Sequence, residues 1–104
     1  MDESKFGELV KASQIKNGDI VIAVLDRGWV MIGRYWGSPQ EEGLIQSSCV
    51  RSWGTNRGLG QLAHEGVTSS TILDPEGACQ WPVVCRVKLI KCDQKVWEGK
   101  LPTV

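Results

Sequence analysis

Hydrophobic residues follow first a helical spacing and then a strand spacing at the start of the chain. Phe6, Leu9 and Val10 recur at intervals of three and four residues, which predicts a short helical segment within residues 1–16. The apolar run at residues 20–25 is rich in β-branched side chains and lies between turn signals. We therefore expect a strand that is buried on both faces.

The next segment predicts the second strand of a hairpin. Asp26-Arg27-Gly28 supplies a tight connection, after which residues 29–36 alternate between the two faces of a sheet. Trp29 is expected on a core face, and Gly33 in mid-strand predicts a bulge or a close neighbour. The polar stretch 37–43 that follows predicts an exposed loop.

A third strand is expected over residues 44–53. Its middle is polar because of Gln46, Ser47 and Ser48. Small hydroxyl groups on a sheet either line a pocket or lie on a solvated face, and the sequence leaves both alternatives open.

A short helix is predicted over residues 57–65, with one narrow apolar stripe. The stripe consists of Leu59, Leu62 and Ala63. Thr55 or Asn56 is the expected N-cap, and Gly66 ends the helix in a left-handed conformation. The glycines inside this segment, Gly58 and Gly60, lower its helix propensity, so close packing or a nearby ligand is needed to offset them.

The C-terminal part predicts a short strand over residues 67–75, a turn at 74–77 and one long strand over 81–92. The odd-numbered residues of the long strand form its expected core face. Residues 93–104 are expected to be a polar tail that two apolar residues hold against the body, namely Val96 and Trp97.

These elements predict one domain spanning residues 1–104, with a β core at 18–92. The fold class is mainly β. We expect a small, strongly bent antiparallel barrel or half-open sandwich of five to six strands with one short inserted helix.

Charge and hydropathy exclude several classes of protein. Twelve Lys and Arg balance twelve Asp and Glu, so non-specific binding of DNA or RNA is not expected. No apolar run approaches the roughly 20 residues of a membrane span. The acidic N-terminus has no apolar segment behind it, which predicts a cytoplasmic protein without a secretory signal.

The cysteines do not predict a metal centre. Cys49, Cys79, Cys85 and Cys92 contain no Cys-x-x-Cys pair, and His64 is the single histidine. Neither zinc nor any other cofactor is expected, and the cysteines are interpreted as buried free thiols.

The break between the third strand and the helix is the expected ligand site. Unpaired N–H groups at a helix N-terminus, together with glycines, allow a phosphate or carboxylate to approach the backbone. Arg51 and Arg57 could add bidentate contacts and Thr55 a hydroxyl group. The site residues are Arg51, Trp53, Gly54, Thr55, Asn56, Arg57 and Gly58, with Trp36 from the second strand. The alternative is a capped turn whose glycines only make the bend.

Five tryptophans are many for so small a core. Trp29 and Trp81 are expected to fill the core, whereas Trp53 and Trp36 are the candidates for stacking on a base. A hydrolase that uses His64, Arg57 and Asp74 to cleave a phosphodiester is a third hypothesis. It ranks last because His64 has no Ser or Cys nucleophile at a recognisable spacing.

One block of the chain carries a resemblance to a known family. The block comprises Trp53-Gly54-Thr55, Gly58-Leu59-Gly60, Leu62-Ala63, Gly66 and Leu73-Asp74-Pro75, followed by a Val-rich strand. It resembles a family of small bacteriophage-encoded proteins from about Gly18 to Cys92. Val67 is a departure, because relatives often have Pro there. The family has no settled activity, so the resemblance implies origin and fold.

By analogy with small phage proteins that sequester nucleotide signals of host immunity, we expect a non-enzymatic homo-oligomer that binds an anionic nucleotide-like ligand. In that hypothesis Trp53 and Trp36 stack on the base while Arg51 and Arg57 bind phosphate. The alternative is a protein-interaction module whose exposed Trp and Arg residues bind a host or phage protein.

Overall fold

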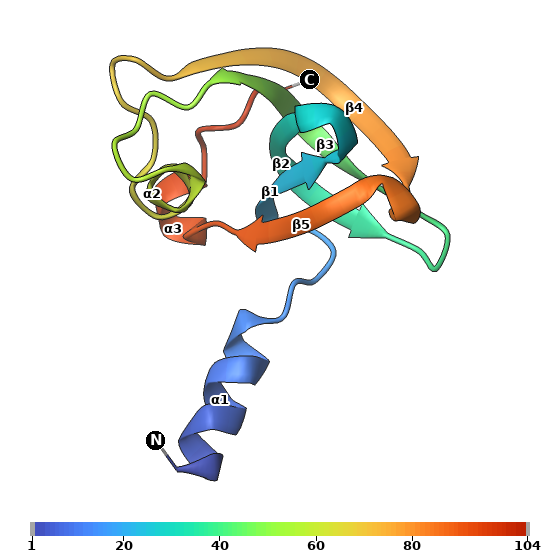
Figure 1. Cartoon of the computed structure of the whole chain (residues 1–104), viewed down its shortest axis with the longest axis vertical. Helices are drawn as coiled ribbons and strands as arrows, with labels where there is room; N and C mark the ends of the chain where they lie inside the picture. The colour runs from blue at the N-terminus through green and yellow to red at the C-terminus, as the bar shows by residue number, and fades with distance from the viewer. Residues whose placement is uncertain (1, 104) are drawn as a thin grey trace.

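The computed structural model describes residues 2–103 and shows a mainly β protein (Figure 1). In this part of the chain five antiparallel strands form one curved sheet in the order β4-β3-β2-β1-β5. The strands are β1 (Ile20–Leu25), β2 (Val30–Gly37), β3 (Glu41–Ser52), β4 (Ile72–Pro82) and β5 (Arg86–Lys91). The sheet is not closed into a barrel, so the half-open form predicted from the sequence is the one observed.

The helices lie at the margins of the sheet. They are α1 (Glu3–Ser13), α2 (Leu59–Glu65) and α3 (Gln94–Trp97), and single 3₁₀ turns form η1 (Asp26–Gly28) and η2 (Val83–Cys85). Figure 1 shows α2 and α3 together at one end of the sheet, whereas α1 extends away from the body.

Strand β1 is the centre of the core, and it is buried on both faces as predicted. Ile20 and Ile22 pack toward α2 and α3 in one cluster, which also contains Trp97. Val21 and Ala23 point to the other face, inside the curve of the sheet. Full burial of each such aliphatic side chain contributes about 1.5–3 kcal/mol, so a charge placed in β1 would strongly destabilise the domain.

The predicted placement of Trp29 in the core is wrong, since this side chain is 57% exposed. The ladder between β1 and β2 ends at the pair Val24 and Val30, so Trp29 belongs to the turn and not to the strand. The close approach predicted at Gly33 is confirmed, because a Cβ atom there would lie 2.8 Å from the carbonyl oxygen of Ile45.

The exposed loop predicted at residues 37–43 is confirmed only over residues 38–40, because the strands on both sides extend further than predicted. A tight turn closes where the Ser38 amide donates to the Glu41 carbonyl at 2.8 Å, and β3 begins at Glu41. Glu42 and Gly43 are buried. The middle of β3 is buried too, since Ser47 is 0% exposed and its hydroxyl donates to the Gly77 carbonyl.

The turn predicted at residues 74–77 is instead part of β4. The register between β3 and β4 shifts on both sides of Ser47, and Gly77 has a φ of 81°. Because β4 is an edge strand, Pro75 has no ladder partner to lose on its open side. The short strand predicted over 67–75 is therefore replaced by a loop followed by β4.

The long strand predicted over residues 81–92 is interrupted. β4 ends at Pro82, η2 turns the chain, and β5 pairs with the far edge of β1. Val87 leaves the predicted core face and is 62% exposed, whereas Trp81 stays buried. The tail behaves as predicted: Trp97 is 1% exposed, and its indole N–H donates to the carbonyls of Leu62 and Ala63.

Candidate functional site

The bend after β3 is hydrogen-bonded to the loop that precedes β4. The Thr71 hydroxyl donates to the Trp53 carbonyl at 2.8 Å, and the Thr68 hydroxyl donates to the Gly54 carbonyl at 2.5 Å. Gly54 has a φ of 69°, and a Cβ atom there would lie 2.4 Å from the backbone of Ser70. The glycine at this position is therefore required by the crossing of two backbone segments.

Two of the backbone amides predicted to bind an anion, those of Asn56 and Arg57, already have a partner within the chain. The Gln61 Oε1 atom accepts hydrogen bonds from the Asn56 and Arg57 amides at 3.2 and 2.9 Å. The predicted N-cap is wrong: α2 begins after Gly58, whose φ of 79° favours glycine, and the Thr55 hydroxyl donates to the Gly58 carbonyl. This bend resembles the capped turn that the sequence left open as the alternative.

Both arginines of the predicted site have acidic partners. The Arg51 guanidinium donates to both carboxylate oxygens of Asp74, at 2.9 and 3.1 Å, and Arg57 pairs with Glu65. Hydrogen bonding to Asp74 raises the pKa of Arg51, and the same contact lowers the pKa of Asp74. Local charge is thus balanced at the bend, although exposed pairs of this kind hold their partners weakly.

Trp36 does not join this site. It pairs with Gly43 near the start of β3, whereas Trp53 follows the last residue of that strand. A Cβ atom on Gly43 would lie 2.7 Å from the Trp36 ring, so Gly43 leaves room for this indole. Trp53 is 42% exposed at the bend. The two rings lie at opposite ends of β3 and cannot stack on one base.

The residues of the predicted hydrolase are not assembled into one site. His64 is exposed on α2, while Asp74 and Arg57 are bound to Arg51 and Glu65. Among residues 2–103, His, Cys, Asp and Glu nowhere gather in a group of three that could hold a metal ion. The cysteines are free thiols; Cys92 is buried and the other three are half-buried.

A buried hydrogen-bonded cluster that was not predicted from the sequence surrounds the carboxylate of Glu42, which is 1% exposed. Its carboxylate accepts hydrogen bonds from Arg86 at 2.8 and 3.1 Å, from the Trp81 indole at 3.0 Å and from the Tyr35 hydroxyl at 3.1 Å. Burial raises the pKa of Glu42, but these hydrogen bonds outweigh it and hold the pKa below its ordinary value. Because every buried polar atom of the cluster has a partner, its role is to fix strands β2 to β5.

A cleft of about 310 Å³ lies where α2, α3 and the C-terminal segment meet. We call it the α2–α3 cleft; its lining residues are Glu65, Gly66, Val67, Val96, Trp97 and Lys100. Val67 is 58% exposed, whereas Trp97 is almost fully buried. The sequence did not predict this cleft, since its two sides lie about thirty residues apart along the chain.

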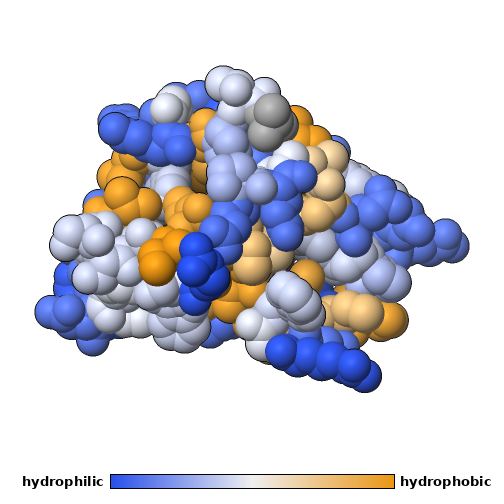
Figure 2. Space-filling model, turned by 90° about the horizontal axis from the view of Figure 1, so that it is seen from above, coloured by the Kyte–Doolittle hydropathy of each residue, from blue (hydrophilic) through white to orange (hydrophobic). Residues whose placement is uncertain are grey.

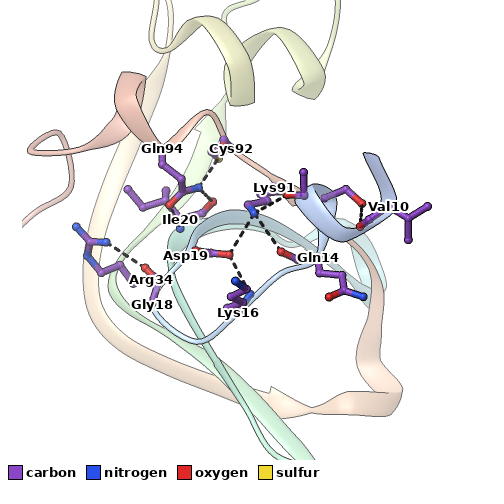
Figure 3. A network of polar contacts seen from close by, with 12 residues as sticks. Val10, Gln14, Lys16, Gly18, Asp19, Ile20, Arg34, Lys91, Cys92 and Gln94 are labelled. Carbon is purple, nitrogen blue, oxygen red and sulfur yellow. Dashed lines mark hydrogen bonds and ion pairs between the residues drawn. The ribbon is translucent and has the colours of Figure 1, made fainter. Parts of the chain in front are cut away.

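Helix α1 is held at its C-terminal end by one lysine (Figure 3). The Lys91 ammonium donates to the carbonyl oxygens of Ala12 and Gln14 at 3.1 and 3.0 Å, and it lies 3.5 Å from Asp19 Oδ2. Asp19 in turn accepts from the Lys16 amide at 2.9 Å. A cation at the last carbonyls of a helix is favourable, so the end of α1 is tied to β5.

Beyond this contact α1 stands free of the body, and none of its residues is buried. Phe6, Leu9 and Val10 form the predicted apolar face, and they are 60%, 49% and 44% exposed. We call these three residues the α1 stripe.

On the opposite side of the molecule, apolar surface is broken up by polar side chains (Figure 2). In the described part of the chain, every helix falls short of the length and apolarity that a membrane span requires.

Comparisons with protein-family models, with curated proteins and with solved structures each returned no match. The resemblance to small phage-encoded proteins therefore stays a prediction.

Proposed function

We propose that the chain is a non-enzymatic protein-interaction module that binds its partner through helix α1. The single observation that carries this proposal is the exposure of the α1 stripe on a helix that contacts the body through Lys91 at its C-terminal end. An apolar stripe at helical spacing is the usual anchor of a helix that docks into a groove of another protein.

The properties of α1 as a helix support this proposal. Eleven residues are marginal for an isolated helix in water, and Gly7 weakens α1 by about 1 kcal/mol. Asp2 caps the helix by accepting from the Lys5 amide at 2.8 Å, so the sequence favours the helix without burying it. A partner that covers the stripe would supply the missing packing.

The charges of α1 favour a protein partner over a lipid surface. Residues 2–13 carry three acids, Asp2, Glu3 and Glu8, against two bases, Lys5 and Lys11. Helices that lie on membranes are typically rich in Lys and Arg, because they bind anionic headgroups. The proposal keeps the cytoplasmic location and the phage origin that the sequence predicts.

Affinity capture with the full chain tests the proposal. We expect a protein partner that the wild-type chain retains, that Phe6→Glu loses and that Ser4→Glu keeps. The two variants add the same charge, but Ser4 lies on the face of α1 opposite the stripe. Capture that is equal for both variants would contradict a role of the stripe.

Binding of an anionic nucleotide-like ligand is the second candidate, and one observation favours it. Trp53 is partly exposed beside Arg51 and Arg57, whose ion pairs are solvent-exposed and could be exchanged for phosphate contacts. A thermal-shift screen with cyclic di- and trinucleotides and ADP-ribose derivatives tests it. A rise in melting temperature that Arg57→Ala abolishes would favour nucleotide sequestration over the interaction module.

A further inference from the structure

The chain carries two apolar surfaces that complement each other in shape. One is convex, the α1 stripe, and the other is concave, the α2–α3 cleft. The cleft has apolar walls at Val67 and Val96 above the buried Trp97. Its volume of about 310 Å³ suits the tips of a few anchoring side chains rather than a whole helix.

Their charges are also complementary. The cleft has one acid and one base in its lining, Glu65 and Lys100. At 100° per residue, the α1 stripe lies between Lys5 on one side and Glu3 on the other. A helix laid in the cleft with one polarity has Glu3 on the side of Lys100 and Lys5 on the side of Glu65, whose exposed pair with Arg57 can exchange for Lys5, and this favours one direction of docking.

The helix does not fill the cleft of its own chain. Lys91 binds the last carbonyls of α1, and from that point α1 runs away from α2 and α3 (Figure 1). The link from α1 to β1 is itself fixed, because Arg34 Nη1 donates to the Gly18 carbonyl at 3.1 Å (Figure 3). Both surfaces are thus presented to a second molecule.

We infer that the partner of α1 is a second copy of this chain, with the α1 stripe of one copy seated in the α2–α3 cleft of the other. This inference rests on the proposed function and names its partner. Each copy gives one helix and receives one, so the contacts either close reciprocally in a two-fold dimer or continue head-to-tail from copy to copy. Phe6 is the largest apolar side chain of the stripe and is its central anchor.

Sedimentation velocity of the full chain over a range of concentrations tests this inference. The wild-type chain is expected to self-associate reversibly. Phe6→Glu and Val67→Glu are each expected to raise the dissociation constant by roughly tenfold or more, because a charge replaces an anchor or a cleft wall. Ser4→Glu and Val84→Glu are the matched controls; Val84 is 88% exposed and lies outside the cleft. Both controls should associate like the wild type.

A mixture of the two disruptive variants gives the sharpest result. The Val67→Glu chain keeps its helix and the Phe6→Glu chain keeps its cleft, so together they should form a one-to-one complex although neither associates alone. Loss of association in Phe6→Glu but not in Val67→Glu would overturn the inference in favour of contact between two α1 helices.

A wild-type chain that stays monomeric at every concentration would also overturn it. The proposed function would survive that outcome if a different protein were captured through the α1 stripe. If Phe6→Glu changed neither self-association nor capture, both proposals would fail.

Discussion

The Arg86 guanidinium donates two hydrogen bonds to the Glu42 carboxylate, at 2.8 and 3.1 Å, across 44 residues of sequence. The carboxylate is buried, while the Arg86 side chain is 34% exposed. This pair joins the first residues of β3 to the first residue of β5, next to the turn η2. It therefore ties the edge strand β5 to β3, the strand next to the opposite edge, at one end of the curved sheet.

Replacing Arg86 with Ala should destabilise the domain by about 2–3 kcal/mol, at or below the lower end of the range for buried pairs, since Arg86 is partly exposed. The variant leaves a buried carboxylate with only the Trp81 and Tyr35 donors. Urea unfolding measures the loss. Arg51→Ala is the matched control, because it removes an equally bidentate pair on the surface. An equal loss of stability in both variants would contradict the role given to burial.

The same pair predicts a pH dependence. The folded pKa of Glu42 lies below its ordinary value of 4.5, so the ionised carboxylate stabilises the fold above that value. This contribution is lost as the pH falls from about 4.5 through the lower folded pKa. Unfolding free energies measured between pH 6 and pH 3 should fall more steeply for the wild type than for Glu42→Gln. Parallel curves would show that Glu42 does not titrate as described.

Two glycines near the bend should respond to alanine in opposite ways. Gly54→Ala places a Cβ 2.4 Å from the Ser70 backbone at a positive φ, and it should destabilise the domain by about 2 kcal/mol or more. Gly60→Ala lies in α2 with open space around it and should stabilise by about 0.5–1 kcal/mol. Thermal unfolding of both variants checks the contrast. A stabilising Gly54→Ala would mean that the two backbone segments do not cross as closely as described.

Trp97 should matter far more for stability than Trp29. Trp97→Phe removes an indole N–H that bonds to the end of α2 and leaves a void, which should cost about 2 kcal/mol. Trp29→Phe changes a side chain that is 57% exposed and should stay within about 0.5 kcal/mol of the wild type. Urea unfolding distinguishes the two, and a Trp29 variant as unstable as the Trp97 variant would refute the assignment.

The sequence predicted an element correctly where the residues within that element decide its conformation. The apolar run of β1, the helical spacing in α1 and the stripe of α2 were each predicted, because every residue that decides them lies within one element. The packing of Trp97 against the body of the domain was also predicted, since a large apolar ring in a polar tail is expected to be buried.

The prediction failed where a distant partner decides the outcome. Asp74-Pro75-Glu76-Gly77 has the composition of a turn, but pairing with β3 on one side and bulges around Gly77 keep it within an edge strand. Glu42 has the composition of a loop residue, and only Arg86 and Trp81 make its burial possible. The bend at Gly54 was correctly placed, yet the partners of the Asn56 and Arg57 amides and of the two guanidinium groups could not be inferred from spacing.

Amide hydrogen exchange of residues 3–13 tests the central claim most directly, because it reports whether a second copy covers α1. In dilute solution these amides should exchange almost as fast as those of an isolated marginal helix. Their protection should rise with protein concentration in the wild type and in Ser4→Glu, but not in Val67→Glu. Protection in α1 that is independent of concentration, or that rises equally in Val67→Glu, would contradict the account.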